Sequence, residues 1–444
     1  MADGNLTLGA LALRDRLADG SLRASELAGE CLAAVEAGRD LEAWAWLDSD
    51  HLMTQAEALD AYRASGGSIG PLHGLPVGIK DIIDTAGIPT ENGTVLDAGR
   101  KPQKDAFVVT RLKQAGAVIM GKTATAELAF LGPPKTRNPH SPDHTPGGSS
   151  SGSAAAVAAG MVSLAVGTQT GGSVIQPAAF CGVVGFKPTF GAIPRTGVLS
   201  QSPSLDTVGV FARSVEDAAL LAETLFGYDE DDPASQIAPA PRLLDIALTD
   251  PPMTPNLAFV RQPAWDTADQ DTRDAFGELV EALGPVCDEI DLPGAFGEAI
   301  RQREIINFAE MAKNYHGYEA RGADRLSAEM RAALADGNGI PARDYLAACD
   351  WPAVLNAGLE AIFDRYDVIV TPAAPGPAPK GLQSTGSSAF NGIWTLCGTP
   401  AITLPLLQAT DGLPMGVQLV GRRGDDARLL RTARWLVQRL SEEG

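Results

Sequence analysis

The sequence predicts an α/β fold, in which helices pack against a β-sheet that is mixed or mainly parallel. Short apolar runs typical of buried strands alternate with stretches typical of helices through the middle of the chain. The chain has 444 residues, of which 45% are hydrophobic and 20% charged, an ordinary globular composition with enough length for a large core. Nothing marks a linker or an internal repeat, so we expect one domain over residues 1–444.

The expected elements follow from hydrophobic periodicity and from the turn residues between the periodic segments. Helices are expected at about residues 8–37 (as two helices), 50–64, 106–114, 153–160, 214–226, 270–283, across most of 295–365, and 427–440. Strands are expected at residues 77–79, 117–120, 164–166, 183–186, 245–248, 367–372 and 416–421. Residues 1–65 would form an N-terminal helical layer, and residues 295–365 a variable helical region near the substrate pocket.

The formal net charge of the chain is −20, from 35 basic and 55 acidic residues. A surface this acidic repels phosphate backbones and anionic lipid, which disfavours nucleic acid and membranes as partners. The five cysteines are scattered without a CxxC pair, so we expect buried free thiols rather than disulfides or a zinc site. No segment is typical of a signal peptide or of a membrane span of ~20 apolar residues, and a cytoplasmic protein is expected.

Two short motifs match familiar patterns but lack the structural context that those patterns need. Residues 116–123 (GAVIMGKT) match the phosphate-binding pattern GxxxxGK[ST], yet the residues between the glycines are themselves a predicted strand. Residues 148–152 (GSSSG) match the GxSxG nucleophile elbow, yet they follow a polar loop rather than a buried strand. We therefore expect no nucleotide-binding site at residues 116–123 and no α/β-hydrolase triad at residues 148–152.

Two loops rich in serine and glycine flank one predicted helix and strand: residues 146–153 (PGGSSSGS) and 167–173 (GTQTGGS). Glycine permits close backbone approach, so such loops can direct consecutive N–H groups at one point, as an oxyanion hole requires. Glycine content alone would equally suit flexible turns. A serine nucleophile also needs a base, and Lys80 ends an apolar strand, where burial would lower the pKa of its amine and leave it neutral. A surface charge is the plain alternative for a lysine at such a position.

Together these segments resemble the amidase signature family over most of the chain. The matching segments are residues 74–84 (GLPVGIKDIID), 116–128 (GAVIMGKTATAEL), 136–159, 167–189 (GTQTGGSVIQPAAFCGVVGFKPT) and 413–430 (LPMGVQLVGRRGDDARLL). The resemblance implies that family's fold, a central mixed, mainly parallel twisted sheet covered by helices on both faces. It also implies an amidase, a hydrolase that acts on the carbon–nitrogen bonds of linear amides without a metal or organic cofactor.

The Ser–cis-Ser–Lys triad of the family falls on Ser173, Ser149 and Lys80. The resemblance implies that Ser173 attacks the carbonyl carbon, and that Ser149, after a cis peptide bond, relays the proton to Lys80 and later delivers it to the leaving nitrogen. An acyl-enzyme forms and water resolves it. The backbone N–H groups expected in the oxyanion hole are those of Thr170, Gly171, Gly172 and Ser173.

The sequence departs from the common pattern of the family around the nucleophile. Ser151 stands where glycine is usual, and Gln169 stands where aspartate is common. Many members carry an arginine shortly after the nucleophile, and this chain has Ile175 and Gln176 at the two places where it occurs. Because such an arginine could clamp a substrate carboxylate through two hydrogen bonds, its absence predicts neutral substrates. Carboxamides and anilides fit that description, as do esters and carbamates (urethanes).

The substrate pocket is expected to be lined by the helical region 295–365 and by residues 372–395. Residue types there and after the nucleophile suggest substrate contacts for Gln176, Phe390 and Trp394, with Phe308 and Tyr315 as further aromatic candidates. Aromatic side chains in such stretches equally suit the core.

Two other functions stay open on the sequence alone. The chain could be the glutamine-hydrolysing A subunit of a tRNA-dependent amidotransferase, which works with a partner subunit. It could also be a catalytically silent scaffold or binding protein, although an intact nucleophile–base set argues against this. The expected partner is a small-molecule amide-type substrate, with neither nucleic acid nor a membrane, and a homodimer is left open.

Overall fold

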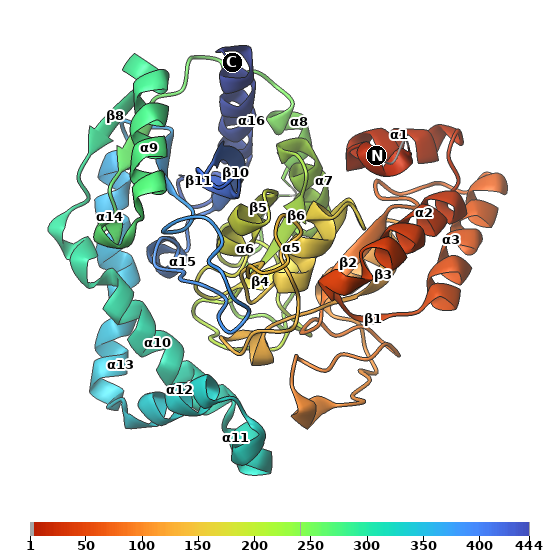
Figure 1. Cartoon of the computed structure of the whole chain (residues 1–444), viewed down its shortest axis with the longest axis horizontal. Helices are drawn as coiled ribbons and strands as arrows, with labels where there is room; N and C mark the ends of the chain where they lie inside the picture. The colour runs from red at the N-terminus through yellow and green to blue at the C-terminus, as the bar shows by residue number, and fades with distance from the viewer. Residues whose placement is uncertain (1–3, 240, 444) are drawn as a thin grey trace.

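A computed structural model describes residues 4–239 and 241–443, and an eleven-stranded sheet runs through this part of the chain (Figure 1). Its strand order is β1-β3-β2-β4-β6-β5-β10-β11-β9-β7-β8. The strands are β1 (Trp44–Leu47), β2 (Pro76–Lys80), β3 (Val118–Thr123), β4 (Leu164–Gln169), β5 (Val184–Lys187), β6 (Thr207–Ala212), β7 (Leu257–Val260), β8 (Cys287–Ile290), β9 (Val368–Pro372), β10 (Ala401–Gln408) and β11 (Pro414–Val420).

The sheet is mixed, which confirms the predicted fold class, but parallel pairing does not dominate it. Of the ten ladders in the described residues, four are parallel and six are antiparallel. The parallel ladders join β2 to β3 and β4, and β7 to β8 and β9, at the two ends of the sheet. Antiparallel pairing fills the middle, where β10 and β11 form a hairpin and β6 runs between β4 and β5. The alternation of strands and helices in the sequence correctly predicted the parallel pairing at the two ends of the sheet. It could not reveal the antiparallel pairing in the middle.

Helices cover both faces of the sheet. Among those that pack on the central strands, α5 and α6 contact each other on one face, and α7 and α16 contact each other on the other, with α8 packed against both. The helices are α1 (Ala10–Asp19), α2 (Ala24–Ala37), α3 (Ser49–Ala64), α4 (Phe107–Gln114), α5 (Ser151–Ala158), α6 (Ile175–Phe180), α7 (Val215–Leu225), α8 (Leu243–Ala247), α9 (Gln270–Leu283), α10 (Ala299–Asn314), α11 (His316–Gly322), α12 (Ala328–Gly339), α13 (Ala342–Cys349), α14 (Trp351–Phe363), α15 (Gly392–Cys397) and α16 (Asp426–Glu443).

The two ends of the molecule differ in Figure 1. Helices α1–α3 lie beside β1–β3 at one end, where the N-terminal helical layer was expected, although β1 interrupts the layer and residues 1–3 lie outside the described part. Helices α10–α14 form a group at the other end, within the region 295–365.

Several helices begin at residues that satisfy the unpaired N–H groups of a first turn. The side chain of Asp48 accepts a hydrogen bond from the His51 N–H at the start of α3, and Ser214 does the same for Asp217 at the start of α7. Each such cap contributes about 1 kcal/mol to helix stability. Helix α1 ends at Gly20, whose φ of +82° is strained for any residue with a side chain.

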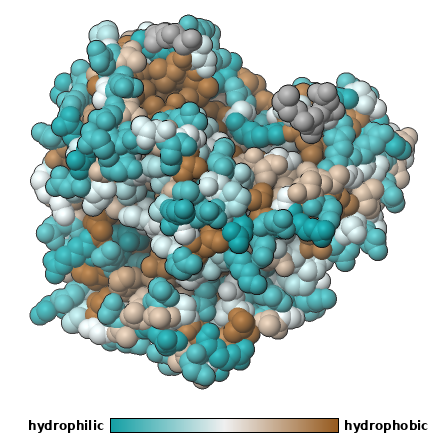
Figure 2. All heavy atoms as spheres, viewed as in Figure 1, coloured by the Kyte–Doolittle hydropathy of each residue, from teal (hydrophilic) through white to brown (hydrophobic). Residues whose placement is uncertain are grey.

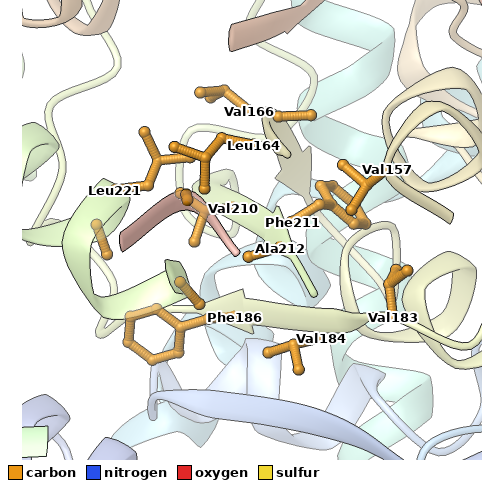
Figure 3. Close-up of a cluster of buried hydrophobic side chains, with 14 of the residues drawn as sticks. Val157, Leu164, Val166, Val183, Val184, Phe186, Val210, Phe211, Ala212 and Leu221 are labelled. Atoms are coloured by element: carbon orange, nitrogen blue, oxygen red, sulfur yellow. The ribbon is translucent and has the colours of Figure 1, made fainter. Parts of the chain in front are cut away.

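The core lies between the middle strands and the helices of both faces. In Figure 3 the side chains of Val166, Val210 and Phe186 come from three neighbouring strands, while Leu221 comes from α7 and Val157 from α5. All five are buried. The register that pairs Val166 and Phe186 with Val210 places them side by side in the sheet, so this cluster holds the strands that carry the two Ser/Gly loops.

One predicted strand is wrong and several strands escaped prediction. Residues 245–248 belong to the region of helix α8, whose buried residues Leu243, Leu244 and Ala247 follow the spacing of one helical face. Strand β10 was hidden because it contains Pro405, which a register shift between Leu404 and Leu407 accommodates. The edge strand β8 has two exposed residues in its middle and therefore shows no apolar run.

The face of the molecule in Figure 2 is mostly hydrophilic, with hydrophobic residues in separate patches. Within the described residues, no helix combines the length and apolar character that crossing a membrane requires. The five cysteines are free, and four of them are buried as expected, whereas Cys349 is exposed on α13.

Candidate active site

Lys80 is the last residue of β2 and its side chain is completely buried. Strand β2 lies between β3 and β4, so its end faces the loops that follow these neighbours. The Lys80 Nζ lies 2.8 Å from the Ser149 Oγ and 2.8 Å from the Thr168 Oγ1. Burial lowers the pKa of Lys80 well below its usual value, and the charge of Asp206 only partly opposes this. The amine therefore favours its neutral form, which is the form that can accept a proton.

Ser149 lies in a loop whose backbone is held from several directions. The Gly148–Ser149 peptide bond is cis, as the resemblance implied. The Ser151 Oγ donates to the Gly147 carbonyl oxygen over 2.6 Å, and the Gly148 N–H donates to the Gln176 Oε1 over 3.1 Å. Ser151, which replaces the usual glycine, is the first residue of α5 and does not have a positive φ, so a side chain fits there without backbone strain.

Ser173 follows Gly171 and Gly172 in the loop between β4 and α6. The Gly171 carbonyl accepts a hydrogen bond from the Thr395 Oγ1 at 2.8 Å, and the Gly172 carbonyl accepts one from the Gln176 N–H at 2.9 Å. In a planar trans peptide the next N–H points away from the carbonyl, so the N–H groups of Gly172 and Ser173 point to the opposite side. Among the described residues they donate to no protein group. Unused backbone donors beside a serine are what an oxyanion hole requires.

Gln169 holds this loop by its side chain. Its Oε1 accepts hydrogen bonds from the N–H groups of Val174 (2.9 Å) and Ile175 (3.0 Å), and its Nε2 donates to the Thr395 Oγ1 over 3.0 Å. Gln169, which stands where aspartate is common in the family, thus binds both the start of α6 and Thr395, whose hydroxyl also holds the Gly171 carbonyl. Its amide positions the nucleophile loop.

Asp206 is a buried carboxylate near Lys80 and Thr170, and the sequence did not predict it as a site residue. Its Oδ1 accepts from the Thr170 Oγ1 over 2.6 Å, and its Oδ2 accepts from the N–H groups of Gln201 and Ser202, each at 2.9 Å. Burial raises the pKa of Asp206 to about 6 despite these bonds. It lies in the segment before β6, and no local pattern there distinguished it from an ordinary turn aspartate.

A cavity of about 260 Å³ opens over the Ser173 loop. Its walls come from residues 129–131, from both Ser/Gly loops, from α10 and from residues 385–388. The regions predicted to line the pocket thus both contribute to it. Phe130 and Phe308 face the cavity as an edge-to-face pair with ring centroids 6.2 Å apart, so the expected aromatic contribution includes Phe308.

The expected substrate contacts fare differently. Gln176 lines the cavity, but its amide is occupied: beside accepting from Gly148, its Nε2 donates to the carbonyl oxygens of Thr385 (2.8 Å) and Ser387 (3.2 Å). It fastens two loops together, and a contact with substrate stays a prediction. Phe390 and Trp394 are completely buried and line none of the cavity, which corrects their expected position.

The aromatic residues outside the cavity are core residues because their segment folds back against the sheet. Trp394 lies in α15 and belongs to a buried cluster with residues of α6, β9 and α14. Tyr315 is likewise buried, and its hydroxyl donates to the Leu128 carbonyl oxygen at 2.7 Å. Aromatic type alone could not distinguish these residues from Phe308.

Arg303 is the second site residue that sequence reasoning missed. It lies on α10 and lines the cavity, with its Nη1 only 3.1 Å from the place that a Cβ on Gly171 would occupy. The prediction of neutral substrates rested on Ile175 and Gln176, which supply no charge beside the nucleophile. A guanidinium nevertheless reaches the same cavity from a distant part of the chain, so the missing family arginine does not leave the cavity without a cation.

Both motif lookalikes lack the required context, as predicted. Residues 118–123 of the phosphate-loop pattern are strand β3. The Lys122 amine is buried and donates to the Thr90 Oγ1 over 2.8 Å and to the Ile83 carbonyl oxygen. Ser150, the serine of the elbow pattern, donates to the Thr168 carbonyl oxygen over 3.1 Å and follows a loop.

Comparison with known proteins identifies the family of this chain. The model of the Amidase family matches residues 26–430. Similar curated proteins include the glutamyl-tRNA(Gln) amidotransferase subunits A of Synechococcus sp. (strain WH7803) and Anaeromyxobacter sp. (strain K). The first is 34% identical over 462 residues and the second 35% over 464, and in each case the match covers 95% of this chain and 94% of the relative.

Solved structures resemble the whole fold. A chain from a vestigial protein complex that reveals the evolutionary origins of an s-triazine catabolic enzyme has a TM-score of 0.90 at 27% identity, covering 97% of this chain and 98% of that one. The peptide amidase PAM, in complex with the competitive inhibitor chymostatin, has a TM-score of 0.86 at 28% identity and covers 97% of each chain. With a family model that matches most of its length and relatives above 30% identity, this chain belongs to the amidase family, the amidase signature enzymes.

Proposed function

We propose that this protein hydrolyses a linear carboxamide through an acyl-enzyme on Ser173, with Ser149 and Lys80 as the proton relay. The observation that carries the proposal is the buried Lys80 amine, 2.8 Å from the hydroxyl of Ser149, in a loop whose Gly148 lines the same cavity as Ser173. Membership of the family supports a hydrolase acting on amides.

The proposed reaction balances within these groups. As the Ser173 Oγ bonds to the carbonyl carbon, its proton passes to Ser149, and the Ser149 proton passes to Lys80. The oxyanion is held by the N–H groups of Gly172 and Ser173, two residues that line the cavity and whose N–H groups have no protein acceptor among the described residues. The relay then runs in reverse to protonate the leaving nitrogen, and the C–N bond breaks. Water attacks the ester by the same route and releases the carboxylic acid.

Amides are the proposed class, and esters and carbamates would pass through the same tetrahedral chemistry. Arg303 lines the cavity, so the proposed substrates are not limited to the neutral ones expected from Ile175 and Gln176. A cytoplasmic enzyme that works without metal or organic cofactor remains part of the proposal.

The test combines a substrate screen with a covalent probe. Amide, ester, carbamate and urea probes are offered to the wild type and to Ser173→Ala, and intact mass records labelling by a serine-directed phosphonate. We expect one phosphonate per wild-type chain, amide turnover, and the loss of both in Ser173→Ala. A chain that takes no label and turns over no probe would instead be a silent scaffold.

A second candidate function is glutamine hydrolysis for a tRNA-dependent amidotransferase. It is favoured by one observation, namely that the similar curated proteins are glutamyl-tRNA(Gln) amidotransferase subunits A, which match nearly the full length of this chain. In that case the chain would release ammonia from glutamine for a partner subunit.

Ammonia release from L-glutamine by the purified chain separates the two candidates. A free-standing amidase turns over small amides at a rate that no added protein changes, with glutamine no better than other amides. An amidotransferase subunit would instead prefer glutamine and would be activated by partner subunits of a related amidotransferase.

A further inference from the structure

The guanidinium of Arg303 lies where a substrate would contact it. Its Nη1 is 3.1 Å from the Cβ position of Gly171 and its Nε is 2.9 Å from the Cβ position of Gly392, so the group is wedged between the nucleophile loop and α15. The side chain is only 12% exposed and lines the cavity that contains Ser173. Gly171 and Ser173 are two residues apart, at most ~7.6 Å between Cα atoms. A ligand of a few bonds can therefore touch both Arg303 and the nucleophile.

The charge of Arg303 is not matched by the protein. Among the described residues it makes no hydrogen bond, and its Nε is buried without a partner. The nearest carboxylate is that of Glu304, at 4.0 Å from Nη2, and the Glu304 side chain is 48% exposed to solvent, which screens it. Burial lowers the pKa of Arg303, which shows the cost of holding this charge out of water.

Another buried arginine, Arg195, has its charge paired with a carboxylate. The Arg195 side chain is 13% exposed, and its Nε and Nη2 donate to the two carboxylate oxygens of Asp232 at 2.9 and 2.7 Å. Arg303 is buried to the same degree and has no such fork. A desolvated guanidinium is stable when an anion pairs with it, and a carboxylate fits its planar donors in two parallel bonds.

The surroundings of Arg303 suit a small polar group. Asn307 lies one turn further along α10 and lines the same cavity, and it accepts a hydrogen bond from the Gln201 Nε2 at 2.9 Å. On the facing loop, the Ser388 Oγ is 3.3 Å from the same Gly171 Cβ position. An amide and a hydroxyl therefore line the same cavity as the guanidinium, while the aromatic pair of Phe130 and Phe308 forms another part of the wall.

We propose that Arg303 binds a carboxylate of the substrate, so that the preferred substrate is a short amide with a carboxylate a few bonds from the scissile carbonyl. The half-amides of small dicarboxylic acids have this chemistry. The proposal rests on the proposed function and names its substrate class. In this proposal Arg303, on α10, binds the substrate carboxylate. In relatives an arginine shortly after the nucleophile could do so, but this chain has Ile175 and Gln176 there.

The experiment compares two probes that differ in one charge, succinamate and succinamide. We expect the wild-type kcat/KM to favour succinamate at least tenfold. Arg303→Gln is expected to reduce that ratio by roughly 10- to 100-fold, mainly through KM, because one charge-assisted hydrogen bond is worth about that factor. Arg303→Lys, which keeps the charge without the fork, should recover part of the ratio. The matched control is Arg301→Gln, an exposed arginine on the same helix, with an unchanged ratio.

Two results would overturn the proposal. One is a wild type that turns over succinamide as well as succinamate, and the other is an Arg303→Gln variant that loses both activities alike and keeps the ratio. If the wild type hydrolyses neither probe and takes no phosphonate, the proposed function fails separately. Calorimetric binding of succinamate to Ser173→Ala then decides: at least tenfold weaker binding after adding Arg303→Gln supports the carboxylate site, and equal binding refutes it.

Discussion

Replacement of Lys80 by methionine tests the proton relay, because it removes the amine and keeps an unbranched side chain of similar length. The Lys80 Nζ contacts the hydroxyl groups of Ser149 and Thr168. Without it, the proton of Ser149 has no base to receive it. Loss of a member of such a unit lowers kcat by a factor of about 10⁴ to 10⁶ in serine hydrolases, and we expect Lys80→Met to lose at least 10⁴ in kcat/KM.

The effect of Lys80→Met on stability should be small by comparison. Each of the two hydroxyls loses one partner at 2.8 Å, which costs about 1–3 kcal/mol for a buried group. Removal of a buried amine offsets part of this, because the amine itself is costly to desolvate. A net loss of about 2 kcal/mol lowers Tm by only about 2 °C, since the unfolding entropy is about 2.1 cal/mol/K for each of the 444 residues.

Lys187→Met is the matched control. Lys187 is also completely buried, but its Nζ donates to the carbonyl oxygens of Thr399 (2.5 Å) and Pro188 (3.1 Å), away from the cavity. We expect a comparable fall in Tm with kcat/KM within threefold of the wild type. The assay is amide hydrolysis, with the rate of phosphonate labelling as a second readout.

The pH profile adds an independent check. The relay needs the unprotonated amine, so kcat/KM should rise with pH, and burial of Lys80 should place the apparent pKa of this rise well below 10.5. The reasoning is refuted by Lys80→Met with more than a tenth of wild-type kcat/KM, by an equal activity loss in Lys187→Met, or by a profile that rises only near pH 10.5.

Three further predictions concern the neighbours of the nucleophile. Ser149→Ala should lower kcat by about 10³ or more, while Tm stays within a few degrees, because the relay is broken between Ser173 and Lys80; unchanged steady-state kinetics would contradict this. Gln169→Leu leaves the N–H groups of Val174 and Ile175 without an acceptor. The free energy of unfolding, measured in urea, should therefore fall by about 2–4 kcal/mol. A free energy of unfolding near that of the wild type would argue against a role for Gln169 in holding the loop. For Asp206, the folded pKa of about 6 lies above the usual 3.8, so the folded protein binds this proton more tightly than the unfolded chain does. The stability of the wild type relative to Asp206→Asn should therefore decrease by about 2 kcal/mol as pH rises from about 4 to about 6. A stability difference that does not depend on pH would refute this.

Local sequence was sufficient for much of the fold. Apolar runs bounded by glycine and proline predicted β2, β3 and β4, and amphipathic periodicity predicted α4, α7 and α9, because these signals are written in neighbouring residues. Strands whose signal is interrupted escaped: β10 contains Pro405 and β8 has polar residues at the sheet edge. The direction of each strand depends on how the chain returns across the sheet, so the antiparallel middle could not be read locally.

The sequence by itself determined the family of this protein and its candidate triad. Lys80, Ser149 and Ser173 lie in short segments whose residue order is itself the signal, since tight glycine loops permit few alternative sequences. Only the tertiary structure decided what surrounds these segments. Packing of α10 against the nucleophile loop brings Arg303 into the cavity, and packing of α15 buries Trp394 in the core. Charge and shape in a pocket are sums over distant parts of the chain, so residues next to the nucleophile could not reveal the arginine opposite it.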